Sequence, residues 1–178
     1  MDRHATFWYF TIVATAGHDT TSFALSGGLE ALLRHPEQIK LLQDDPALAV
    51  NATEEMIRWT SPVRHFLRYL TEPALLSGTE IPAGDRLLLS YPSANRDERF
   101  FADPMAFDVT RANANRTIAF GAGEHFCLGS SFARREIRTI LPRLFAAVSD
   151  IALDGAPQFA EANFVGGVKH LPVTASLR

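Results

Sequence analysis

The ten residues around the only cysteine of the chain constrain its fold and chemistry more than any other feature. They read Phe120-Gly121-Ala122-Gly123-Glu124-His125-Phe126-Cys127-Leu128-Gly129. The glycines at 121 and 123 permit a tight bend, after which we predict that Cys127 opens a helix running to about Ala147. At a helix start, free backbone N–H groups and the helix dipole stabilise a thiolate. The stretch therefore predicts an anionic sulfur on a sharply bent loop.

A lone cysteine is most often an inert buried residue, so the interpretation depends on what surrounds it. One cysteine allows no intramolecular disulfide, which fits a reducing cytoplasm, and it excludes a zinc site with several thiolates. No G-x-G-x-x-G or G-x-S-x-G string occurs at this loop. Gly129 lets the backbone pass close to a flat ligand, and a thiolate suits haem iron, where it favours O–O cleavage.

The order F-x-x-G-x-x-x-C-x-G resembles the signature loop of the cytochromes P-450, in particular of the bacterial soluble type. The resemblance implies a haem b cofactor (iron protoporphyrin IX) with Cys127 as the metal ligand. It places Phe120 against the haem near the sulfur, Gly121 and Gly129 in the cofactor-binding loop, and His125 as a donor to a haem propionate. The alternative for His125 is a loop histidine with a local hydrogen-bond partner.

A second informative string lies on a long helix expected from about His4 to Arg34. Ala16 and Gly17 are small enough to leave room for a diatomic ligand beside the helix, and Gly17 permits a bend. Thr20 can donate a hydrogen bond to a carbonyl of the preceding turn. Asp19 and Thr20 together can relay protons. The string resembles the oxygen-binding helix of the same family, which implies that both residues are catalytic; the alternative is an ordinary surface acid beside two threonines.

The N-terminal segment has a competing interpretation. Arg3 followed by the apolar run Ala5–Ala14 has the outline of a signal peptide, although the run is too short to span a membrane. The oxygen-binding helix accounts for the same residues better. With 17 basic and 20 acidic residues and a net charge of −3, the chain is no nucleic-acid-binding polycation. We expect a cytoplasmic protein with neither nucleic acid nor membrane as a partner.

Three residues between the two strings are predicted to form a charge triad. Asp45 and Pro46 predict a helix start, and Glu55 and Arg58 lie three positions apart on that helix, which should end near Thr60. Alone, the pair is typical of a solvated helix face. The resemblance identifies it as the E-x-x-R element and implies a buried structural triad with Arg111.

The resemblance also implies contacts to propionate, substrate and electron donor. Arg68 is expected to bind a propionate, with Arg64 as the rival. Basic residues at Arg134 and Arg135 would receive a ferredoxin-type iron–sulfur donor with its reductase, unless they belong to a solvated helix face. The expected substrate pocket is mostly apolar and suits a small hydrophobic compound; its residues are Ile12, Thr15, Val63, Phe66, Phe164 and Val165.

Several strings look most like the α-terpineol-hydroxylating subgroup of the family: residues 14–22, 90–98 and 163–167. The expected fold is mainly α with small β-sheets, including strands at Phe66–Leu70 and Arg86–Ser90, an irregular segment over 95–116 and hairpins in the tail. Residues 1–178 would form the C-terminal, haem-binding part of a single cytochrome P-450 domain, an incomplete fold whose N-terminal half is absent.

The function implied is a haem-dependent monooxygenase. Such an enzyme inserts one atom of dioxygen into a small hydrophobic substrate with electrons from NAD(P)H. Two alternatives stay open, a truncated and inactive remnant and a haem-binding sensor or electron-transfer module. The intact pair of Asp19 and Thr20 favours oxygen chemistry over the sensor, because a sensor needs no proton relay.

Overall fold

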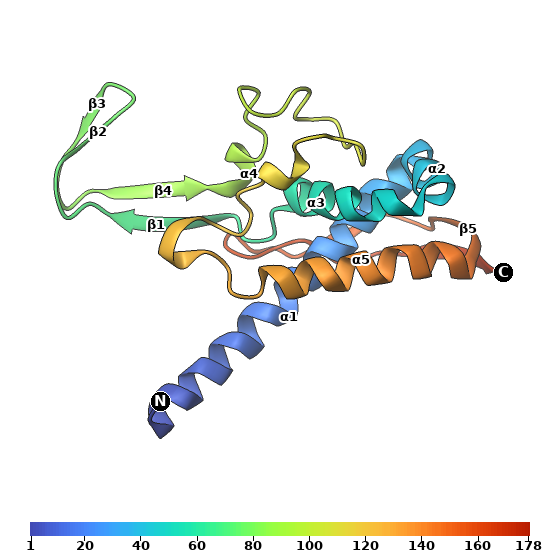
Figure 1. Cartoon of the computed structure of the whole chain (residues 1–178), viewed down its shortest axis with the longest axis horizontal. Coiled ribbons are helices and arrows are strands. Elements are labelled where there is room, and N and C mark those ends of the chain that lie inside the picture. Colours follow the sequence, from blue (N-terminus) through green and yellow to red (C-terminus); the bar gives the residue numbers. More distant parts are fainter.

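The computed structural model describes all 178 residues and has the predicted character, mainly helical with small antiparallel sheets (Figure 1). The helices are α1 (Arg3–Arg34), α2 (Pro36–Asp44), α3 (Ala49–Thr60), α4 (Tyr91–Ala94) and α5 (Ser130–Ala147), with 3-10 turns at Pro46–Leu48, Ala114–Arg116 and Gly123–His125. Antiparallel strands pair β1 (His65–Tyr69) with β4 (Arg86–Ser90), β2 (Ala74–Leu76) with β3 (Thr79–Ile81), β5 (Val148–Leu153) with β8 (Val173–Leu177), and β6 (Gln158–Phe159) with β7 (Val168–His170).

Aspartate side chains cap the starts of α1 and of the 3-10 turn that precedes α3. The Asp2 carboxylate accepts a hydrogen bond from the Ala5 N–H at 2.7 Å and caps α1. Asp45 caps as predicted, accepting from the Ala47 N–H at 3.0 Å, but it opens a 3-10 turn that precedes α3. The prediction that Cys127 opens a helix is wrong, because α5 begins at Ser130 and has Gly129 at its N-cap position.

The core lies where the C-terminal half of α1 crosses α3 and α5. Gly27 and Gly28 of α1 face α3 so closely that a Cβ at Gly28 would lie 2.2 Å from Met56 Cε. The Ser26 hydroxyl donates to the Val168 carbonyl at 2.9 Å and ties α1 to β7. The buried apolar residues of the core are Ala24, Ala31, Leu32, Ile39, Leu42, Ala52, Met56, Ile57, Phe107, Val109, Ile137, Leu141 and Phe145.

The N-terminal half of α1 projects away from this core (Figure 1). Its large apolar side chains, Phe7, Trp8, Phe10, Ile12 and Val13, are exposed. The chain exposes 11458 Å² in all, whereas a compact protein of its mass exposes about 8,600 Å². Much apolar surface is therefore uncovered around α1. No helix has an apolar stretch of the length and hydropathy needed to cross a bilayer.

Candidate functional site

The cysteine loop is a closed, tight structure built by two glycines. Gly121 and Gly123 have φ of 71° and 68°, in the left-handed region that disfavours other residues. The Gly121 N–H donates to the Ile118 carbonyl at 2.8 Å, and the Cys127 N–H donates back to the Phe120 carbonyl at 2.9 Å. The Cys127 carbonyl accepts from the Ser130 N–H at 3.2 Å in a turn, and α5 follows with the bond from the Ala133 N–H to the Gly129 carbonyl at 3.0 Å. The predicted bend is present.

The sulfur of Cys127 lies at the surface of this loop. Cys127 is exposed, and Phe126 and Leu128 on either side of it are exposed as well. The N–H groups of Leu128 and Gly129 donate to no backbone carbonyl, so they are available near the sulfur. A sulfur ligand set between apolar side chains suits a flat apolar ligand with a metal at its centre.

The donor set fits a metal that brings its own equatorial ligands. Cys127 is the only cysteine, and the chain has no cluster of three or more His, Cys, Asp or Glu side chains that could hold an ion. A metal with one protein ligand needs its remaining coordination from a prosthetic group, and an iron porphyrin supplies four nitrogens. The residues present therefore fit a haem.

The predicted proton-relay residues lie at the middle of α1. The Thr20 hydroxyl donates to the Ala16 carbonyl at 2.8 Å, the hydrogen bond expected from the sequence. Asp19 accepts from His18 Nδ1 at 2.8 Å, and both side chains are exposed. A Cβ at Gly17 would meet nothing within 4 Å, so space is open beside the helix there. The helix runs without a break through Gly17.

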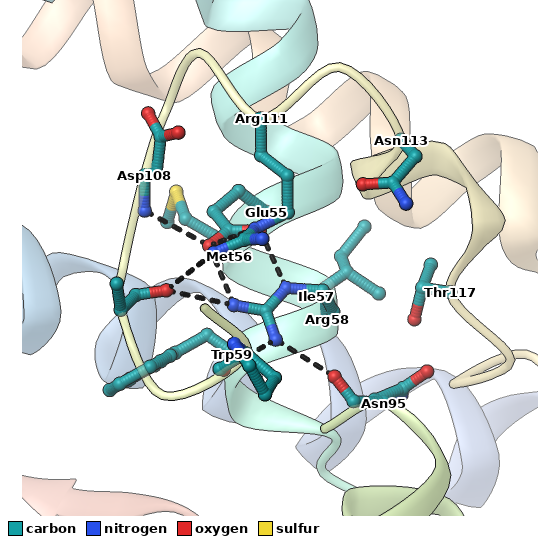
Figure 2. Close-up of polar contacts among 12 residues, drawn as sticks. Glu55, Met56, Ile57, Arg58, Trp59, Asn95, Asp108, Arg111, Asn113 and Thr117 are labelled. Atoms are coloured by element: carbon teal, nitrogen blue, oxygen red, sulfur yellow. Dashed lines mark hydrogen bonds and ion pairs between the residues drawn. The ribbon is translucent and has the colours of Figure 1, made fainter. Parts of the chain in front are cut away.

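The three residues of the charge triad meet in the interior (Figure 2). Arg58 and Glu55 form a bidentate pair with Nε–Oε2 and Nη2–Oε1 distances of 2.7 Å, and both side chains are 0% exposed. Arg111 Nε contacts the same carboxylate at 3.2 and 3.3 Å. The Asp108 N–H donates to Glu55 Oε1 at 3.0 Å. The predicted pairing of Glu55 with both arginines is therefore present.

The two arginines of the triad also hold the irregular segment before the cysteine loop. Arg58 donates to the carbonyls of Asn95 at 2.8 Å and Pro104 at 3.0 Å, and Arg111 donates to those of Asp103 at 3.0 Å and Ala106 at 2.8 Å. Segment 95–111 is thereby ordered around guanidinium groups, without strand pairing of its own.

Asn95 is a site residue that sequence reasoning missed. It is 0% exposed, its Nδ2 donates to the Ser61 hydroxyl at 2.8 Å, and its Oδ1 accepts from the Ile118 N–H at 2.9 Å. Asn95 thus connects the end of α3 to the residues just before Phe120. The signal in the sequence is its place inside the string 90–98, which resembles the α-terpineol-hydroxylating subgroup.

The two candidate propionate arginines have different surroundings. Arg68 is half-buried on β1 opposite Leu87, and its guanidinium has one local contact, to the Leu67 carbonyl at 3.0 Å. Arg64 is exposed, and its guanidinium packs against Gly166. Neither guanidinium pairs with a carboxylate, so the choice of Arg68 over Arg64 stays a prediction.

Four of the predicted substrate residues come together and two do not. Val63 and Val165 form an isolated antiparallel bridge, and the rings of Phe66 and Phe164 meet edge to face at 5.4 Å. Ile12 and Thr15 lie on the projecting half of α1 and are exposed. A surface cavity of about 460 Å³ lined by Arg99, Phe100, Ala112, Asn113, Asn115 and Arg116 contains none of the predicted site residues.

The two arginines expected to receive an electron donor differ in their surroundings. Arg135 is exposed. Arg134 is partly buried, with a side-chain exposure of 22%, and its Nε contacts Glu54 at 2.8 and 3.1 Å. Arg138 contacts the same carboxylate at 2.7 Å. The Glu54 pair was not foreseen, since 80 residues separate it from Arg134.

Known proteins are similar to this chain in sequence and fold. The family model described as cytochrome P-450 matches residues 9–148. Cytochrome P-450-terp of a Pseudomonas species is 44% identical over 165 residues, 93% of this chain and 38% of its own length. The steroid C26-monooxygenase of Mycobacterium tuberculosis is 43% identical over 165 residues, 91% of this chain and 41% of its own length.

A solved structure gives the same result for the fold. The crystal structure of CYP108D1 from Novosphingobium aromaticivorans superposes with a TM-score of 0.90 at 44% identity, covering 96% of this chain and 41% of that one. The chain therefore spans about two fifths of the length of these relatives. It has the corresponding part of their fold.

Proposed function

The chain belongs to the cytochrome P-450 family, and from that membership we propose that residues 1–178 are the C-terminal, haem-binding part of a monooxygenase domain. The observation that carries the proposal is the loop in which Cys127 stands exposed between apolar side chains, behind a bend that only glycines adopt readily. The relatives named as monooxygenases and hydroxylases support the reaction class. Haem b is the cofactor that such a loop suits.

When bound, the haem supplies the site at which dioxygen is reduced and one oxygen atom is transferred to the substrate. The chain contributes the thiolate of Cys127 as the iron ligand. Phe120, His125 and Arg68 are proposed to contact the ring and its propionates, since an aromatic face and two cationic or donor groups match them. Glu55, Arg58 and Arg111 fix the segment that precedes the loop.

Helix α1 is proposed to line the place where oxygen would react. There the small side chains of Ala16 and Gly17 leave space, and Asp19 and Thr20 move protons toward the site where oxygen reacts. The apolar contacts of Val63 with Val165 and of Phe66 with Phe164 suit a small hydrophobic substrate. Electrons from NAD(P)H would arrive through a ferredoxin-type donor at Arg135, the exposed member of the arginine pair, in the cytoplasm.

One experiment tests this proposal directly. The chain is expressed with haem supplied, reduced, and exposed to carbon monoxide, and its absorption spectrum is recorded. A Soret band near the wavelength that names the family is expected, because that band requires thiolate ligation. Absence of haem uptake would instead support an inactive remnant, and a stable haem complex that never reacts with dioxygen and substrate would support a sensor or electron-transfer module.

Replacement of Thr20 is expected to separate electron consumption from product formation. In a complete enzyme with its electron donor, Thr20→Ala should lower the product formed per NAD(P)H by at least about tenfold and release peroxide instead, because a positioned proton donor contributes that much or more. Thr20→Ser keeps a hydroxyl and should retain most of the coupling. Unchanged coupling in Thr20→Ala would remove Thr20 from the relay.

Replacement of Arg68 should weaken haem retention more than replacement of Arg64. A charge-assisted contact to a propionate is worth about 1.5–3 kcal/mol, so Arg68→Ala should raise the haem dissociation rate by about tenfold or more. Transfer of haem to an excess of apomyoglobin measures that rate. Equal effects of Arg68→Ala and Arg64→Ala would contradict the assignment.

A further inference from the structure

Two adjacent glutamates at the middle of α3 are both buried and serve different partners. Glu55 is bound by Arg58 and Arg111, whereas Glu54, only 4% exposed, faces α5. There Arg134 Nε reaches both Glu54 oxygens at 2.8 and 3.1 Å. A buried carboxylate is stable only when it is paired, so Glu54 needs its partners on α5.

Arg134 also contacts Phe120, the first residue of the cysteine loop. Its guanidinium lies over the Phe120 ring at 4.4 Å from the centroid, within the range of a cation–π interaction. The Phe120 carbonyl accepts the hydrogen bond from the Cys127 N–H at 2.9 Å. Contacts therefore run without interruption from Glu54 through Arg134 and Phe120 to Cys127.

We propose that Arg134, oriented by Glu54, is a positioning residue that fixes the Phe120 ring and with it the loop that presents Cys127. Arg134 is held by the Glu54 carboxylate in the interior, so its planar group is pre-organised to stack on the ring. The consequence of this position for the iron ligand rests on the proposed function; the position of the loop itself does not.

The variant Arg134→Lys distinguishes positioning of the Phe120 ring from simple neutralisation of the Glu54 charge. Lys keeps the positive charge toward Glu54 but has no planar group to lie on Phe120. If Arg134 only neutralises Glu54, the cysteine loop in Arg134→Lys should open as rarely as in the unmodified chain. If it positions Phe120, Arg134→Lys should loosen the loop. Arg138→Lys is the matched control, because Arg138 contacts the same Glu54 carboxylate at 2.7 Å and belongs to the same helix.

The Cys127 amide reports the position of the loop residue by residue. Its hydrogen exchange rate, measured by NMR on the full chain without added haem, depends on how often the bond to Phe120 opens. Arg134→Lys and Phe120→Leu are each expected to raise this rate by about threefold or more, the size of one exposed cation–π contact. The double variant should exchange no faster than the faster single variant, because both changes remove the same contact. Arg138→Lys should leave the rate unchanged.

Two results would overturn the inference. The first is a Cys127 exchange rate in Arg134→Lys equal to that of the unmodified chain. The second is an equal increase in Arg138→Lys, which would indicate general loosening of α5. If Arg134→Lys does not fold, Glu54→Gln removes the orienting charge and should raise the rate in the same way. Failure of the chain to take up haem would refute the proposed function. The inference about Arg134 would still be tested, because the exchange rates are measured without haem.

Discussion

Cys127→Ser is expected to abolish the thiolate spectrum completely while leaving the chain folded. The sulfur is exposed and makes no side-chain contact needed by the core, so the free energy of unfolding should change by no more than about 0.5 kcal/mol. The carbon monoxide complex of the reduced, haem-loaded variant should lack the Soret band near the wavelength that names the family, because serine is a weak iron ligand. Absorption spectra of the two proteins, loaded in parallel, provide the measurement.

The control for this experiment is His125→Ala on the same loop. His125 is exposed and is proposed to contact a propionate, not the iron, so its variant should keep the spectral band while binding haem less tightly. A Cys127→Ser variant that retains the band would show that another group ligates the iron, and the assignment of the site would be wrong.

The largest expected loss of stability belongs to Glu55→Ala. This change leaves Arg58, which is 0% exposed, and Arg111 as uncompensated charges in the interior. Breaking a buried ion pair from one side costs about 3–5 kcal/mol. Urea unfolding followed by far-UV circular dichroism should show that loss, and the variant should retain little haem per chain after purification.

Two further variants test whether the charge of Glu55 is responsible. Glu55→Gln keeps an acceptor for the Asp108 N–H and should lose less stability than Glu55→Ala. Glu161→Ala removes an exposed acid outside the triad and should change the free energy of unfolding by no more than about 0.5 kcal/mol. Normal haem content and stability in Glu55→Ala would show that the triad does not stabilise the fold.

Local signals predicted the helices, the family resemblance supplied the triad, and contacts that depend on long-range packing were not predicted. The start of the Asp45 turn, the Thr20 hydrogen bond and the pairing of Glu55 depend on residues near in sequence or on a motif. The start of α5 was predicted too early, because a turn closed by the Ser130 N–H and the Cys127 carbonyl precedes the helix.

Glu54 was missed for a different reason. An acid next to another acid on a helix is usually solvated, and only the packing of α3 on α5 buries it against Arg134. The adjacent position gave one indication. Side chains at 54 and 55 point about 100° apart on a helix, so the arginines that bind Glu55 do not also bind Glu54. Two buried acids in a row therefore demand two separate sets of cations.

The carbonyl contacts of Arg58 and Arg111 have a consequence for how the segment 102–106, which lies between Arg58 and Arg111 in sequence, can evolve. Every residue type carries a carbonyl, so a segment held through its carbonyl oxygens depends little on its own side chains, and none of residues 102–106 is buried. Its conformation is specified from outside, by two guanidinium groups and the acid between them. Side chains in this segment can therefore be substituted, and the surface that they form can change, without a change in the cysteine loop.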